Sequence, residues 1–125
     1  MSISGLSMQR ESLSVTTARA ASGELVVQMD GNADLRVQSE FSALLQRIHH
    51  EALKTNTRLV IVHMEGLEFL SSGCFKGLCT WIRLMLEKNP TYSLRLVSNP
   101  RHYWQTRSLH AVQMLAPDLV EIQRA

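Results

Sequence analysis

The 125-residue sequence lacks the segments that mark membrane-spanning, secreted and nucleic-acid-binding proteins. Its longest unbroken aliphatic run, residues 59–62, is far too short to cross a bilayer. The opening stretch MSISGLSMQRES has no basic segment followed by an apolar one, so we expect no secretory signal. The 13 basic and 11 acidic residues are interspersed, and no cluster of Lys and Arg with interleaved aromatic residues appears. We therefore expect no membrane span and no nucleic-acid partner.

Cysteine is scarce, which limits covalent cross-linking. The two cysteines, Cys74 and Cys79, lie five residues apart in one predicted helix and on different faces of it. Thiols placed in this way do not easily form a disulfide with each other, and unpaired thiols are typical of a reducing compartment. We interpret both as small core residues and expect a cytoplasmic protein.

Sequence motifs for catalysis and metal binding are also missing. Ser72 is followed directly by Gly73, which does not fit the G-x-S-x-G turn of a serine hydrolase, and SSGCFKGL does not fit a phosphate-binding P-loop. The five histidines do not have metal-ligand spacing. We interpret the adjacent His49 and His50 as surface residues near a helix C-terminus, and His63 as a hydrogen-bonded core residue. No catalytic residue, cofactor or metal is expected.

The chain does contain alternating strand and helix patterns. Apolar residues recur with helical spacing from Val37 to near Asn56, and again after Ser72 until Asn89-Pro90. A third helix is predicted from Asn99-Pro100 until Pro117, with its inward face formed by Trp104, Ala111 and Leu115. The predicted strands are residues 12–18, 24–30, 58–64, 92–98 and 119–123.

These elements predict one α/β domain over residues 12–125, preceded by a flexible lead-in over residues 1–11. The first two strands, joined by a Ser22-Gly23 turn, form an antiparallel hairpin, and the later strands run parallel because each follows a crossover helix. The result is a mostly parallel sheet with three main helices. The continuous apolar run 58–64 suggests an interior strand covered on both faces.

The junction EFLSSGCFKGL, residues 68–78, is the main candidate for a functional site. Sites in such sheets lie beyond the carboxyl ends of the strands, where helices begin. Ser71 and Ser72 lie there, and so does Asp34 in the loop GNAD (31–34), so the two loops are expected to meet. One serine is expected to cap the helix. A phosphate in the first helical turn would also face free N–H groups and the positive end of the helix dipole.

The order of elements, the motifs LEFLSSGCF and GNAD, and the third-helix stretch YWQTRSL together resemble the STAS domain of bacterial anti-sigma-factor antagonists. The resemblance spans residues 12 to 123. The family's second helix begins at Phe-x-Asp-Ser-Ser-Gly. Laid without a gap from Phe69, this motif places Ser71 on the family's aspartate and Ser72 on its phosphorylated serine. With one residue deleted, Ser71 takes the phosphorylated position instead. Asp34 falls on the acidic residue beside the phosphorylation site.

The resemblance implies a regulatory protein that binds a partner protein and catalyses nothing itself. It implies a serine kinase of the anti-sigma type that phosphorylates Ser72, or alternatively Ser71, and a metal-dependent serine phosphatase that reverses the reaction. The implied partner-binding surface contains Asp34, Ser71, Ser72, Gly73 and Lys76. Two alternatives remain at this stage. One is a STAS-type module that binds a small ligand or a larger assembly constitutively, without phosphorylation, and the other is a small enzyme with a Ser72 or Cys74 nucleophile.

Overall fold

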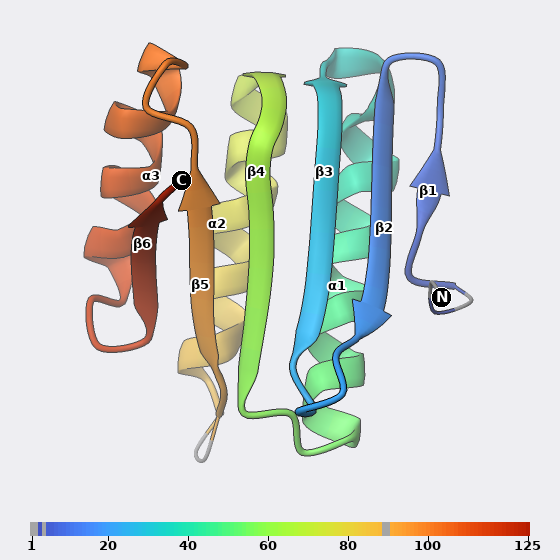
Figure 1. Ribbon diagram of the computed structural model, residues 1–125, viewed down its shortest axis with the longest axis vertical. Coiled ribbons are helices and arrows are strands. Elements are labelled where there is room, and N and C mark those ends of the chain that lie inside the picture. The colour runs from blue at the N-terminus through green and yellow to red at the C-terminus, as the bar shows by residue number, and fades with distance from the viewer. Residues whose placement is uncertain (1–2, 4, 89–90) are drawn as a thin grey trace.

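The computed structural model describes residue 3 and residues 5–88 and 91–125, which form one six-stranded sheet (Figure 1). The strands follow the chain order across the sheet. Strands β1, β2 and β3 pair antiparallel, and β3, β4, β5 and β6 pair parallel. Their bounds are β1 (Met8–Gln9), β2 (Leu13–Arg19), β3 (Leu25–Ala33), β4 (Leu59–Leu70), β5 (Ser93–Ser98) and β6 (Val120–Arg124).

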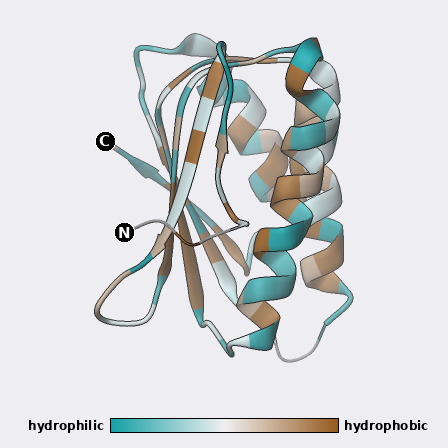
Figure 2. Ribbon diagram, turned by 90° about the vertical axis from the view of Figure 1, so that its right-hand side faces the viewer, coloured by the Kyte–Doolittle hydropathy of each residue, from teal (hydrophilic) through white to brown (hydrophobic). Residues whose placement is uncertain are grey.

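Three helices cover one face of this sheet, as Figure 2 shows. They are α1 (Gln38–Lys54), α2 (Ser72–Leu86) and α3 (Tyr103–Leu115), and a short 3-10 helix, η1 (Leu35–Val37), precedes α1. The main core lies between the helices and the sheet, and its largest members include Trp81, Tyr92 and Phe41. The predicted α/β architecture, with an antiparallel N-terminal hairpin, a mostly parallel sheet and three main helices, is confirmed. The predicted stop of the second helix at Asn89-Pro90 lies outside the described residues.

Strand β4 is an interior strand, as predicted, because it pairs with β3 on one side and β5 on the other. The prediction that both of its faces are covered is wrong. Val60, Val62 and Met64 are buried under the helices, whereas Ile61 and His63 on the opposite face are only half-buried. The reason is that all three helices pack on the same side of the sheet. His63 is therefore not a core residue; its Nδ1 lies 3.2 Å from a Glu65 carboxylate oxygen.

The expected lead-in over residues 1–11 also needs correction. Met8–Gln9 form β1, in which Met8 pairs with Val15 of β2, so the sheet includes one more strand than predicted. Leu6 and Met8 are 6% and 4% exposed and belong to the core. Burial of the Leu6 and Met8 side chains stabilises the packing of this segment against the rest of the domain by roughly 1.5–3 kcal/mol each.

Helix α3 begins later than predicted. The Asn99 side chain accepts a hydrogen bond from the Arg101 N–H at 3.0 Å, and the His102 N–H donates to the Asn99 carbonyl at 3.0 Å. Asn99 therefore forms a turn ahead of the helix, and His102 occupies the position before its first residue, Tyr103. An asparagine before proline is as suitable for a turn as for a helix cap, so the local sequence did not separate the two.

The inward face of α3 also differs from the prediction. Gln105, Leu109 and Val112 are buried, whereas Ala111 and Leu115 are exposed and Trp104 is half-buried. The Gln105 side chain is turned inward because its amide donates to the Met64 and Leu67 carbonyl oxygens at 2.7 and 3.0 Å, and its oxygen accepts from the Asn99 N–H at 2.8 Å. This polar residue thus ties α3 to β4 and to the end of β5.

His49 is a core residue, which corrects its interpretation as a surface residue. Its ring is 2% exposed, and its Nδ1 lies 2.7 Å from the Tyr92 hydroxyl, which also accepts a hydrogen bond from Trp81 Nε1 at 2.6 Å. The indole N–H only donates, so the Tyr92 hydroxyl accepts from Trp81 and its own O–H stays available for His49. Burial lowers the pKa of His49, so its neutral ring is favoured.

Candidate functional site

The candidate site lies where β3 and β4 end at the same edge of the sheet. The two strands pair in parallel up to Ala33 and Leu70, with two register shifts along the way. The Ser71 N–H donates to the Ala33 carbonyl at 2.8 Å, and the Cys74 thiol donates to the Asp34 carbonyl at 3.7 Å. The two loops therefore meet as predicted, although the first three residues of GNAD belong to β3 and only Asp34 lies beyond the strand.

Ser71 is the residue that caps α2. It has extended backbone angles (φ −67°, ψ 161°), its side-chain oxygen accepts a hydrogen bond from the Cys74 N–H at 3.2 Å, and its carbonyl accepts from the Phe75 N–H at 2.9 Å. This is the geometry of a serine N-cap, in which one of the free N–H groups of the first turn gains an acceptor. The half-buried Ser71 hydroxyl thus has a structural role.

Ser72 has different surroundings, although it is the next residue. It is the first residue of α2 and its side chain is exposed. Within the described part of the chain its hydroxyl has no hydrogen-bond partner, and the N–H groups of Ser72 and Gly73 have no intrahelical acceptor. Lys76, one turn further along the helix, is also exposed. An exposed hydroxyl here lies at the positive end of the helix dipole.

Gly73 is half-buried and lies against α1. A Cβ atom at this position would overlap the side chain of Gln38, the first residue of α1, and a Cβ atom on Gly77 would lie 2.6 Å from the Ser42 hydroxyl. The two glycines, one turn apart, let the two helices approach closely. As a result, the start of α1 borders the start of α2.

The Asp34 carboxylate is hydrogen-bonded to Arg36 and to neither Ser71 nor Ser72 in the described part of the chain. Asp34 accepts hydrogen bonds from the Arg36 N–H at 3.0 Å and from its guanidinium at 2.9 Å, which caps η1. The hydrogen bond from the Arg36 side chain holds the pKa of Asp34 below its ordinary value. Asp34 is therefore charged at neutral pH, with its charge compensated by a neighbouring guanidinium.

Two exposed apolar side chains flank the serines, and sequence reasoning missed both. Leu35 is 77% exposed and directly follows Asp34, and Phe69 is 49% exposed and lies two residues before Ser71. The helical spacing that begins at Val37 leaves Leu35 off the apolar face, which was the available signal in the sequence. Single exposed apolar side chains are common on protein surfaces, and these two supply apolar contact area for another protein near the serines.

The chemical groups at this site do not favour catalysis. The Cys74 thiol is buried, and burial raises its pKa, so the nucleophilic thiolate is disfavoured. In residues 5–88 and 91–125, no histidine contacts either serine hydroxyl, and no group of three His, Cys, Asp or Glu side chains is arranged to hold a metal ion. The site therefore offers an exposed hydroxyl, a helix N-terminus, an ion pair and two apolar side chains.

Comparisons with known proteins identify the fold. No protein-family model matches the chain, and no curated protein matches its sequence. Among solved structures, an anti-sigma factor antagonist from Mycobacterium paratuberculosis has a TM-score of 0.67 at 13% identity, over 90% of this chain and 88% of that one. The STAS domain of an antisigma-factor antagonist from Rhodobacter sphaeroides has a TM-score of 0.52 at 11% identity, over 70% of this chain and 88% of that one.

This chain thus has the fold of STAS-domain anti-sigma-factor antagonists, as its sequence motifs suggested. None of the helices in the described residues is both long enough and apolar enough to span a bilayer.

Proposed function

We propose that this chain is a regulatory protein that binds a partner protein around the start of α2, and that phosphorylation of Ser72 weakens this binding. The observation that carries the proposal is the division of roles between two adjacent serines, since Ser71 caps the helix and leaves the Ser72 hydroxyl exposed. The α2-start surface, as it is called below, consists of Asp34, Leu35, Phe69, Ser71, Ser72, Gly73 and Lys76.

The chemistry of a phosphate at Ser72 explains how the fold is kept while binding changes. A phosphoserine carries about −1.5 to −2 charges at neutral pH and three strong acceptor oxygens. The N-terminus of α2 and the exposed Lys76 accommodate negative charge, so α2 keeps its structure. Leu35 and Phe69, however, then lie beside a strongly hydrated group, and burying them against a partner requires that group to lose water. Binding is weakened by this desolvation.

The proposed partners follow from the resemblance to anti-sigma-factor antagonists. We propose a serine kinase of the anti-sigma type, which transfers phosphate from ATP to Ser72, and a metal-dependent serine phosphatase, which removes it. The chain is then a substrate in both reactions and not an enzyme. The alternative acceptor, Ser71, is less suitable because its hydroxyl is half-buried and hydrogen-bonded. The free thiols of Cys74 and Cys79 support the cytoplasm as its location.

A second candidate function is constitutive binding by a STAS-type interaction module. The exposed Leu35 and Phe69 favour it, because an apolar contact surface works without any phosphate. The sequence favours it too, because Ser71 stands where the ungapped family motif has the aspartate that precedes the phosphorylated serine.

Mass spectrometry of the protein purified from its native cells distinguishes these functions. We expect phosphate on Ser72, and none in the Ser72→Ala variant produced in the same cells. The Ser71→Ala variant is the matched control and is expected to retain the modification. A protein that copurifies with a partner but carries no phosphate on either serine would support the constitutive module instead. Phosphate confined to Ser71 would contradict the assignment to Ser72.

A further inference from the structure

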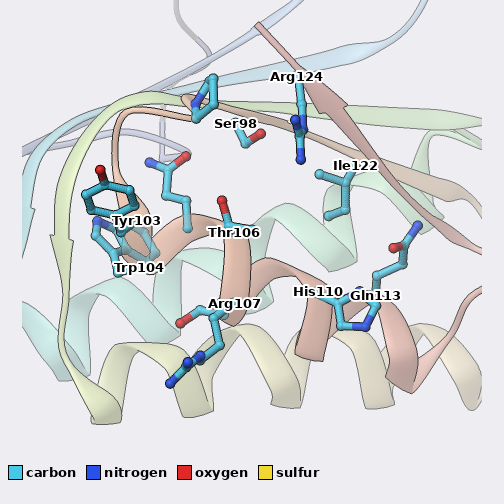
Figure 3. Close-up of a pocket in the computed structure, with 12 residues that line it drawn as sticks. Ser98, Tyr103, Trp104, Thr106, Arg107, His110, Gln113, Ile122 and Arg124 are labelled. Carbon is cyan, nitrogen blue, oxygen red and sulfur yellow. The ribbon is translucent and has the colours of Figure 1, made fainter.

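A second surface feature lies along α3 and the edge strand β6. Helix α3 extends past the edge strand β6 in Figure 1, and a cavity of about 1010 Å³ opens between the helix and the strand. We call it the α3–β6 groove. Figure 3 shows its lining, which consists of Ser98, Pro100, Tyr103, Trp104, Gln105, Thr106, Arg107, Ser108, His110, Gln113, Ile122 and Arg124.

The backbone of β6 has one side paired and one side facing away from the sheet. The Leu94 N–H donates to the Leu119 carbonyl at 2.8 Å, and the Ala125 N–H donates to the Ser98 carbonyl at 2.9 Å. Successive residues of a parallel strand direct their backbone groups to alternate sides. The odd-numbered residues of this segment therefore bond to β5, and the even-numbered residues direct their N–H and C=O groups away from it.

Of these even-numbered residues, Val120 already has partners within the chain. Its N–H donates to the Ala116 carbonyl at 3.0 Å, and its carbonyl accepts from the Gln113 side chain at 3.2 Å. Ile122 and Arg124 remain, and in the described residues their outward backbone groups have no partner. An exposed edge of this kind is a template for an additional strand.

Ile122 and Arg124 also line the α3–β6 groove with their side chains. They share a face of β6 with the buried Val120, so both side chains lie on the helix side of the sheet. Figure 3 shows Arg124 directed into the cavity from the end of β6. The free backbone edge and the groove are thus presented by the same two residues.

The lining of the groove combines apolar side chains with basic ones. Trp104 is half-buried, and its indole N–H donates to the Glu68 carbonyl at 2.9 Å, which fixes the ring against the end of β4. Arg107, Arg124 and His110 contribute basic groups, and the lining contains no Asp or Glu. Neither arginine forms an ion pair within the described part of the chain.

We propose that the α3–β6 groove binds an extended acidic segment of a partner protein, which adds to β6 as a further strand. In such an addition, the two peptide residues opposite Ile122 and Arg124 lie two positions apart and direct their side chains into the groove. An apolar residue opposite Ile122 contacts the apolar side chains of the lining, and an aspartate or glutamate opposite Arg124 pairs with its guanidinium.

Two other occupants fit the groove less well. A small organic anion pairs with Arg124 but leaves the outward backbone groups of Ile122 and Arg124 without partners. A second copy of this chain, paired through its own β6, brings a second set of the same basic groups to the groove and is disfavoured by repulsion. An extended acidic peptide both hydrogen-bonds to the outward backbone groups of β6 and carries charge opposite to that of the arginines.

Fluorescence anisotropy with a short labelled peptide tests the proposal. The peptide repeats valine-threonine-aspartate-threonine, which places valine and aspartate on one face of a strand. We expect Arg124→Glu to weaken its binding about tenfold or more, because an attractive charge pair becomes repulsive. Arg58→Glu is the matched control, since Arg58 is exposed at the opposite end of the sheet and its replacement should change binding by no more than about twofold.

Hydrogen exchange then locates the bound peptide. We expect the peptide to slow exchange of the Ile122 and Arg124 amides, and a version with lysine in place of aspartate to leave both unchanged. Arg124 is exposed, so Arg124→Glu should melt within a few degrees of the wild type. The proposal is overturned if the acidic peptide does not bind, if Arg124→Glu binds it as well as the wild type, or if the slowed amides lie elsewhere. Dimerisation through β6 in sedimentation experiments would also overturn it.

Discussion

Replacing Ser71 or Ser72 with alanine should have unequal effects on stability, although the residues are adjacent. The Ser71 hydroxyl accepts from the Cys74 N–H at 3.2 Å, so Ser71→Ala leaves that buried N–H without its acceptor. The Ser72 hydroxyl is exposed, and Ser72→Ala removes no hydrogen bond that the described residues make. The two variants therefore separate the structural hydroxyl from the free one.

The expected magnitudes follow from these surroundings. Loss of a serine cap costs about 1 kcal/mol of unfolding free energy, and Cys74 is fully buried, so water does not replace the missing acceptor. A substitution at an exposed position such as Ser72 changes the unfolding free energy by no more than about 0.5 kcal/mol. Ser72→Asp places a carboxylate at the positive end of the α2 dipole, with an expected gain of about 0.3–1 kcal/mol.

Urea denaturation of the three variants, followed by fluorescence of the buried Trp81 and by circular dichroism, measures these differences. The slope of free energy against urea should be the same for all of them, because none changes the surface exposed on unfolding. Equal destabilisation by Ser71→Ala and Ser72→Ala would refute the division of roles between the serines. Marked destabilisation by Ser72→Asp would refute the claim that the helix start accommodates negative charge.

Three further predictions concern other polar groups. Tyr92→Phe should cost about 3 kcal/mol in urea denaturation, because it leaves the Trp81 N–H and His49 Nδ1 buried without a partner; a loss below about 1 kcal/mol would contradict the network. Because burial lowers the pKa of His49, the unfolded chain binds more protons below a pH of about 6.5, so stability should fall as the pH drops from about 7 to 5. His49→Gln should flatten the dependence of stability on pH in this range, and an unchanged slope would mean that another group causes the fall in stability. Arg36→Gln should raise the pKa of Asp34 towards about 3.9 in an NMR titration, and an unshifted value would mean that another group holds it low.

The architecture was predictable from the sequence because apolar periodicity and connection rules restrict it strongly. The run that became β4 contains Val60, Val62 and Met64, and its interior position follows from the crossover helices on either side of it. This run did not show that the helices cover only one face of β4, because the half-buried Ile61 on the uncovered face is apolar as well. An apolar side chain on an open face is common in folded proteins.

Features that depend on polar contacts between distant residues were not predictable. His49 is buried because Tyr92, far along the chain, supplies its hydrogen bond, and Gln105 is turned into the core because carbonyl groups of β4 accept from it. A local pattern counts such residues as surface residues. Strand β1 was missed for a related reason, since Met8–Gln9 is too short to show any periodicity.

The candidate site was predictable in outline. The meeting of the two loops follows from the parallel pairing of β3 and β4, and a helix start at Ser-Ser-Gly follows from capping preferences. The sequence did not show which serine forms the cap, because both are adjacent to the first turn. It also did not show the exposure of Phe69, which belongs to the otherwise apolar end of β4.

The central claim is that phosphate on Ser72 controls binding at the α2-start surface, and a binding isotherm tests it most directly. The partner is first captured from native cells on the unmodified protein and then purified. Its affinity is measured for the unmodified protein and for protein carrying phosphoserine at position 72. The account predicts that phosphate on Ser72 weakens binding about tenfold or more, while the domain keeps its melting temperature within a few degrees. Equal affinity of the unmodified and Ser72-phosphorylated proteins for that partner would contradict it.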